Sequence, residues 1–145
     1  MAALTRYLRR HMATGTLDLG PLRRSLSALR KVTRMDLDDD VVRDAAVKRF
    51  EFTYEQAHKL LRRYIESASA DPAAVDAMTF PDLIRTANEQ GLLSGDWPRW
   101  RAFREMRART SHTYHEDTAR AVVSMIPDFV AEARFLRDEL KRRLR

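Results

Sequence analysis

The sequence predicts an all-α protein, an up-and-down bundle of four to five helices. Its 145 residues include only four glycines and five prolines, so few tight turns are available. Apolar residues recur every three or four positions over long stretches, which is the period of a helix with one buried face. With 44% apolar and 33% charged residues, the chain has the composition of a globular domain rather than of a disordered segment.

The first two bundle helices are predicted from such stripes and from the residues that begin them. Pro21 suits the first turn of a helix that should fade near residues 34–36. The longest periodic segment, 41–68, is the expected central helix. The three aspartates at 38–40 should cap its free N–H groups. A metal site there is the less favoured interpretation, because adjacent side chains point in different directions.

The second half of the chain is expected to contain a loop at 67–79 and then three more helices. Pro81 should open a short helix that ends at Gly91, and Asp96 should cap the helix after it. The last helix, 119–144, carries Pro127, which is expected to kink or break it.

The bundle domain is assigned to 18–145, and 1–17 to an N-terminal extension, either a short helix or a mobile arm. The formal net charge of +6 suits a polyanionic partner such as nucleic acid, or an acidic protein. A solvated arginine-rich surface would account for the charge equally well. With no cysteine, the chain can form neither disulfides nor thiolate sites. No apolar run approaches the ~20 residues of a membrane span, so we expect a cytoplasmic protein that does not bind membranes.

Positive charge, a histidine and a tyrosine gather in one segment near the middle of the second half. Residues 99–109 hold five arginines and one acid, and Arg107 is followed by His112 five positions later and by Tyr114. Metal-free RNA cleavage needs a group that moves the 2′-OH proton and a cation that holds the phosphate, which are the roles of histidine and arginine. Such a site would need neither metal nor cofactor. The same pattern also fits a helix cap and a packed tyrosine.

The side chains around this pair could bind RNA. Thr110 and Ser111 offer hydroxyl donors, and Arg104 and Arg109 offer further cations for phosphate. On a regular helix, five residues separate two side chains by roughly 140°, so one copy would not present both members of the pair together. A shared site therefore requires a helix break near 111–113 or two copies that face each other.

Several blocks of the chain resemble the nucleotidyltransferase substrate-binding proteins, a branch of the HEPN superfamily. They are residues 43–55 (RDAAVKRFEFTYE), 91–93, Trp100, and 107–114 together with Glu116, within a match that runs from about 22 to 140. The resemblance implies a helical bundle, a homodimer, and pairing with a separately encoded minimal nucleotidyltransferase (MNT). In related toxin–antitoxin modules the HEPN member is a metal-independent ribonuclease.

By this resemblance Arg107 and His112 take the catalytic positions. Tyr114 takes the position of a tyrosine that the MNT antitoxin modifies with AMP in some members. Two functions follow: a HEPN toxin-like endoribonuclease, or a non-catalytic substrate-binding subunit of a two-component nucleotidyltransferase. Ala108 favours the second, since family members often carry Asn or Asp after the motif arginine.

Overall fold

The computed structural model describes residues 2–3, 17–111 and 115–144. Between Leu17 and Leu144 the described residues form six helices and no strand, which confirms the all-α prediction. The helices are α2 (Gly20–Val32), α3 (Asp40–Ala68), α4 (Pro72–Asp76), α5 (Phe80–Glu89), α6 (Trp97–Thr110) and α7 (Glu116–Arg143). The extension expected at 1–17 lies almost wholly outside the described residues.

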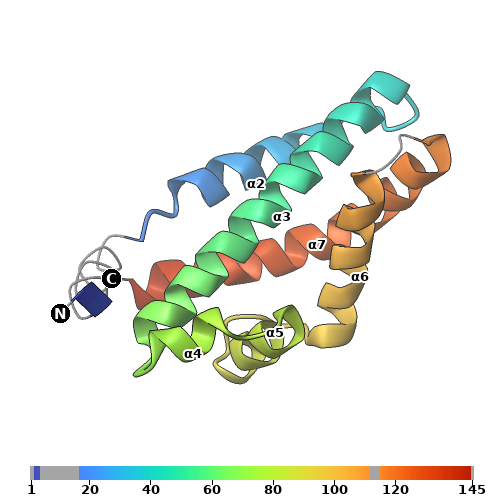
Figure 1. The fold of residues 1–145 in the computed structure, drawn as a ribbon. Helices are drawn as coiled ribbons and strands as arrows, with labels where there is room; N and C mark the ends of the chain where they lie inside the picture. Colours follow the sequence, from blue (N-terminus) through green and yellow to red (C-terminus); the bar gives the residue numbers. More distant parts are fainter. Residues whose placement is uncertain (1, 4–16, 112–114, 145) are drawn as a thin grey trace.

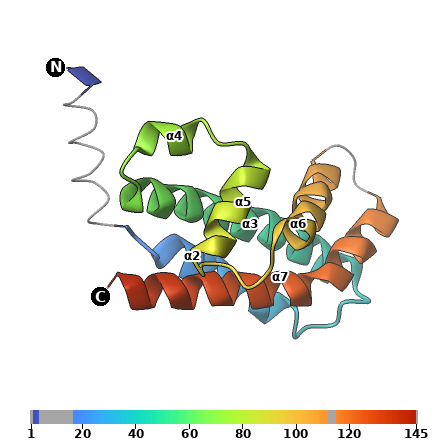
Figure 2. The ribbon, with the colours of Figure 1, turned by 90° about the horizontal axis from the view of Figure 1, so that it is seen from below.

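Four of the helices alternate in direction along the bundle. Helix α2 runs antiparallel to α3, α6 returns toward the start of α3, and α7 runs back beside it (Figure 1). Helices α4 and α5 form the connection at the far end. Helices α4 and α7 lie on opposite sides of α3, which packs against both (Figure 2). The central position predicted for the 41–68 segment is confirmed.

Aromatic rings from three helices meet at the centre of the core. Phe129 of α7 stacks edge-to-face on Phe50 of α3 at 5.0 Å between ring centroids, and on Phe103 of α6 at 5.3 Å. Trp100 packs on Phe103 in the same way at 5.4 Å. These four side chains are almost fully buried. Edge-to-face aromatic pairs stabilise a core by more than the burial of their apolar area alone. These pairs therefore fix α6 against α3 and α7.

The predicted helix starts are confirmed at both aspartate caps. Asp39 accepts a hydrogen bond from the Val41 N–H at 2.8 Å, and Asp96 accepts one from the Trp97 N–H at 2.7 Å. The helix before Gly91 ends as expected, because that glycine has φ = 75°, a conformation that costs other residues energy.

The structure contradicts an unbroken loop at 67–79 and a break of the last helix at Pro127. The loop expected at 67–79 contains α4, whose signals are Asp71, which accepts from the Ala74 N–H, and Pro72 at the first position. Its buried side chains hold this single turn against α3. Pro127 does not break the last helix: α7 continues through it, because Ile126 and Phe129 on either side are buried in the core. No helix in the described ranges is long and apolar enough to cross a membrane.

Candidate ribonuclease site

Arg107 lies in the last turn of α6, where two carboxylates of α3 hold its guanidinium. Its Nη2 donates to Glu55 Oε1 at 2.5 Å, and its Nη1 lies 4.0 Å from Glu51 Oε2. Nη1 also donates to Ser111 Oγ at 2.6 Å. The arginine side chain is 23% exposed. The group is therefore oriented from two sides yet open to solvent.

The two carboxylates reach the same guanidinium because they are four residues apart on one helix. Side chains at i and i+4 share a face, and this face of α3 crosses the end of α6. The Glu51 side chain is 15% exposed and Glu55 46% exposed. Lys48 lies 3.7 Å from Glu51 and adds a second cation there. Glu55 is the more accessible partner of the two.

Helix α6 ends three residues after this arginine, at Thr110. The Thr110 hydroxyl donates to the Arg107 carbonyl at 2.8 Å, the Ser111 hydroxyl donates to it at 3.3 Å, and the Ser111 N–H donates to Ala108 O at 3.2 Å. The helix thus stops where a site shared by Arg107 and His112 would require it to stop. His112 and Tyr114 themselves lie outside the described residues.

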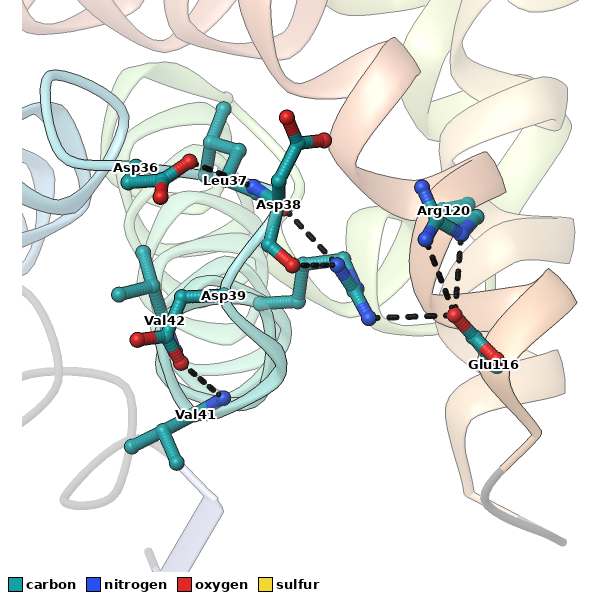
Figure 3. A network of polar contacts seen from close by, with 9 residues as sticks. Asp36, Leu37, Asp38, Asp39, Val41, Val42, Glu116 and Arg120 are labelled. Carbon is teal, nitrogen blue, oxygen red and sulfur yellow. Dashed lines mark hydrogen bonds and ion pairs between the residues drawn. The ribbon is translucent and has the colours of Figure 1, made fainter.

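The chain resumes at α7, and its start is also anchored to α3. Glu116 accepts from Arg43 Nη2 at 3.3 Å and from Arg120 Nη2 at 3.0 Å. The buried Arg43 further donates to the carbonyls of Leu37 and Asp38, at 3.1 and 2.7 Å. Figure 3 shows Glu116 and Arg120 on α7 facing the turn that carries Asp36 to Asp39. Both ends of the 112–114 segment are therefore tied to one helix, through Arg107 before it and Glu116 after it.

The other predicted site residues of α6 lie along its exposed face. The Arg104 guanidinium sits 4.8 Å from the ring centre of Phe80, a cation–π contact, and Arg109 is exposed. Burial raises the pKa of the Tyr54 phenol to about 12. The positive charges of Arg104 and Arg107 both oppose this rise, because they favour the phenolate. Arg104 and Arg107 thus share one positive region, while Thr110 and Ser111 turn toward the helix end.

Glu51 and Glu55 were not among the predicted site residues. The signal that could have found them is an acidic pair at i and i+4 inside the block RFEFTYE, on the longest helix. Their basic partner lies 52 positions away for Glu55, so local sequence could not assign it. No group of three or more acidic or histidine side chains in the described part of the chain is placed to hold a metal ion.

Residues 17–142 match the family model described as nucleotidyltransferase substrate binding protein like. The chain belongs to this family. A Haemophilus influenzae member described as a probable ribonuclease HepT is 37% identical over 112 residues, which are 74% of this chain and 76% of that relative. This family member therefore has a HEPN-type or nucleotidyltransferase-associated role.

Two solved structures share the fold of this family member. One is a Haemophilus influenzae protein described as a substrate-binding domain of a nucleotidyltransferase. It aligns with a TM-score of 0.78 and 32% identity over 86% of this chain and 99% of that chain. A crystal structure of a Thermus thermophilus protein aligns with a TM-score of 0.63 and 30% identity over 86% of this chain and 98% of that chain. Both likenesses support the helical-bundle prediction.

Proposed function

We propose that this family member is a HEPN toxin-like, metal-independent endoribonuclease restrained by a minimal nucleotidyltransferase. The observation that carries the proposal is the placement of Arg107. Its guanidinium is fixed and partly exposed at a helix end, five residues before His112. The 37% identical relative described as a probable ribonuclease supports the same activity.

In this reaction His112 takes the proton from the ribose 2′-OH. The 2′ oxygen attacks phosphorus and displaces the 5′ oxygen of the next nucleotide, which gains a proton and leaves as a hydroxyl. The products are a 2′,3′-cyclic phosphate and a 5′-hydroxyl end. Arg107 donates hydrogen bonds to the phosphoryl oxygens, whose negative charge grows in the transition state. The Ser111 hydroxyl, which accepts a hydrogen bond from the Arg107 guanidinium, would offer a further donor to the phosphate.

In this mechanism the phosphate must bind an arginine that already contacts two carboxylates, those of Glu51 and Glu55. A phosphate approaching the guanidinium must compete with Glu55, whose side chain is 46% exposed and can turn into solvent. The less exposed Glu51 can remain and keep the guanidinium oriented. Arginine has five N–H donors in a planar fork, so it can serve a phosphate and one carboxylate together.

The pairing with MNT and the homodimer belong to the same proposal. Two copies would place the Arg107 and His112 of each subunit at one cleft. Modification of Tyr114 with AMP would add phosphate charge two residues from His112 and repel RNA. Control by the nucleotidyltransferase would then act directly on the cleavage site.

Cleavage of labelled RNA by the purified chain in EDTA tests the proposal. We expect cleavage by the wild type, and loss of at least about a hundredfold in rate for His112→Ala, the usual size of a general acid–base contribution. His115→Ala is the matched control, since it removes an exposed histidine three residues away. Equal cleavage by the wild type and His112→Ala would assign the activity to another site or to a contaminant.

The second candidate is a non-catalytic adaptor that presents substrate to the nucleotidyltransferase. Two observations favour it: Ala108 has no polar side chain, and the charge of Arg107 is already compensated by carboxylates. Calorimetric titration with a minimal nucleotidyltransferase, followed by nucleotidyl-transfer assays with and without this chain, separates the two cases. The adaptor function requires a complex at micromolar concentration and a change in transfer rate.

A further inference from the structure

A basic cavity of about 400 Å³ lies between α2 and α7, formed by residues outside the Arg107 site. It is lined by five cations and one hydroxyl, with no acid: Arg23, Ser27, Arg30, Lys31, Arg34 and Arg137. Together these six residues are called the α2–α7 groove below. None of them lies on α3 or α6, the helices that hold Arg107. The groove is therefore separate from the candidate cleavage site.

The positive charge of this groove is largely uncompensated. Within the described part of the chain, only Arg137 of the five groove cations makes an ion pair, with Asp138 at 2.9 Å. Repulsion from Arg134, followed by desolvation and by Arg34 and Arg137, lowers the pKa of Arg30. By contrast, Arg142 and Arg143 at the end of α7 are both paired with Glu139. An anion in the groove would relieve this repulsion.

The spacing of the cations indicates the shape of that anion. Arg23, Ser27 and Lys31 are four residues apart, so they form one stripe along α2 on the side away from its buried leucines, and Arg34 follows in the turn after the helix. The eight residue steps from Arg23 to Lys31 span roughly 12 Å of helix. One strand of a duplex rises about 3.4 Å per nucleotide along the helix axis, so some three or four phosphates could follow such a stripe. A single phosphate would use only part of it.

We propose that the α2–α7 groove binds the sugar–phosphate backbone of an RNA strand, as a second anchoring surface away from the Arg107–His112 site. The identification of RNA as the polyanion rests on the proposed ribonuclease function. Contacts from arginine and lysine to phosphates carry no sequence information, so the groove adds affinity and orientation without selecting bases. It favours substrates long enough to reach both surfaces.

Fluorescence anisotropy with labelled single-stranded RNA tests the groove, on a His112→Ala background that leaves the RNA intact. Adding Arg30→Gln and Arg34→Gln should weaken binding about tenfold at 50 mM salt. It should also reduce the slope of log K against log salt by about 1.4, because each lost phosphate contact contributes about 0.7 for a single strand. The matched control is Lys59→Gln with Arg63→Gln, two exposed cations four residues apart on α3, which should change binding less than twofold.

The outcomes separate this proposal from the ribonuclease proposal. If the wild type cleaves no RNA but binding depends on Arg30 and Arg34, the ribonuclease proposal fails and the groove stands. If the variant with Arg30→Gln and Arg34→Gln binds RNA as tightly as the His112→Ala background, or if that background binds no RNA at all, the groove proposal is overturned whatever the cleavage result. If the groove variant binds RNA normally but loses the nucleotidyltransferase partner, the groove is a protein interface and its assignment to RNA is wrong.

Discussion

At the scale of single residues, the accessible carboxylate beside Arg107 should oppose RNA binding. Glu55 occupies the guanidinium that a phosphate would use, and an exposed ion pair of this kind contributes at most about 1 kcal/mol. Glu55→Gln should therefore tighten RNA binding up to about fivefold, the factor that 1 kcal/mol represents, because one competing charge is removed. Anisotropy measured on the His112→Ala background gives the affinity.

Glu105→Gln provides the comparison for that experiment. It removes the same charge from an exposed acid of α6 whose partner is Arg101, at 3.0 Å, rather than Arg107. A change below twofold is expected there. Weaker RNA binding by Glu55→Gln would mean that this carboxylate orients the arginine more than it competes for it.

His58 makes the stability of the fold depend on pH. Its ring lies 4.7 Å from Phe80, and its Nε2 is buried with no hydrogen-bond partner among the described residues. Burial, and then the charges of Arg62 and Arg104, lower the pKa of His58 below the ordinary value of 6.5. The unfolded chain therefore takes up this proton first, and stability should fall as pH drops through 6.5 toward the folded-state pKa.

Urea unfolding at pH 7.5 and 5.5 measures this dependence. The free energy of unfolding of the wild type should be lower at pH 5.5, and His58→Phe should lose that part of the decline. Phenylalanine can keep the contact with Phe80 and cannot be protonated. An unchanged pH dependence in the variant would assign the decline to other groups.

At the scale of helices, one buried carboxylate fastens the α5–α6 loop to α7. The fully buried Glu132 accepts hydrogen bonds from the Gly95 N–H at 2.8 Å, from Trp100 Nε1 at 2.9 Å and from the Ser94 hydroxyl. A Cβ on Gly95 would lie 2.9 Å from this carboxylate, so the close approach requires glycine. Glu132→Ala would remove the shared acceptor of three donors, one of which, Trp100 Nε1, is in the core, and should lower the free energy of unfolding by about 3 kcal/mol or more.

Asp128, which shares the partner Arg99 with Glu132, supplies the control. Arg99 lies 3.8 Å from Glu132 and 4.0 Å from Asp128, whose side chain is exposed. Asp128→Ala should therefore cost less than about 1 kcal/mol, as exposed pairs do. Urea unfolding of the two variants side by side checks the difference, and a similar cost for both would contradict the anchoring role of Glu132.

The helices could be predicted from sequence wherever their signals are local. The stripe after Pro21 and the caps at Asp39 and Asp96 each depend on residues within one or two turns. The continuity of α7 through Pro127 could not be predicted, because burial of its flanks by other helices outweighs a local breaking signal. The five residues of α4 carry local start signals, but they too depend on packing against α3.

The candidate site likewise contains residues that local sequence predicts and partners that it does not. Local sequence singled out the helix-end residues Arg107, Thr110 and Ser111, whose mutual contacts lie within four positions. The partners supplied by α3 are 52 positions away in the case of Glu55 and 73 positions away in the case of Arg43 and Glu116. Such pairs follow from how α3 crosses α6 and α7, and a helical stripe alone does not fix those crossings.

At the scale of the whole molecule, two large exposed apolar side chains lie on α3, near the Arg107 site. Val41 and Phe52 are 70% and 52% exposed, and eleven residues of helix return them to within about 20° of each other. An apolar pocket of about 240 Å³ borders Phe52, lined also by Ser25, Ala28, Lys48 and Arg49. Glu55, the accessible partner of Arg107, is three residues further along. A second copy on this face would lie against the site.

Under the homodimer proposed above, Phe52 should be an anchor of the interface, and the matched change on α7 should not matter. Truncating such an anchor costs about 2 kcal/mol, so Phe52→Ser should weaken the dimer about thirtyfold, as followed by light scattering across a dilution series. Phe135→Ser, at a side chain 37% exposed on α7, should leave the dimer unchanged. RNA cleavage by Phe52→Ser should fall at low protein concentration and recover at high concentration, because dissociation rather than misfolding removes the shared site. If the Phe52→Ser dimer dissociates over the same concentration range as the wild type, the interface lies on another face of the bundle.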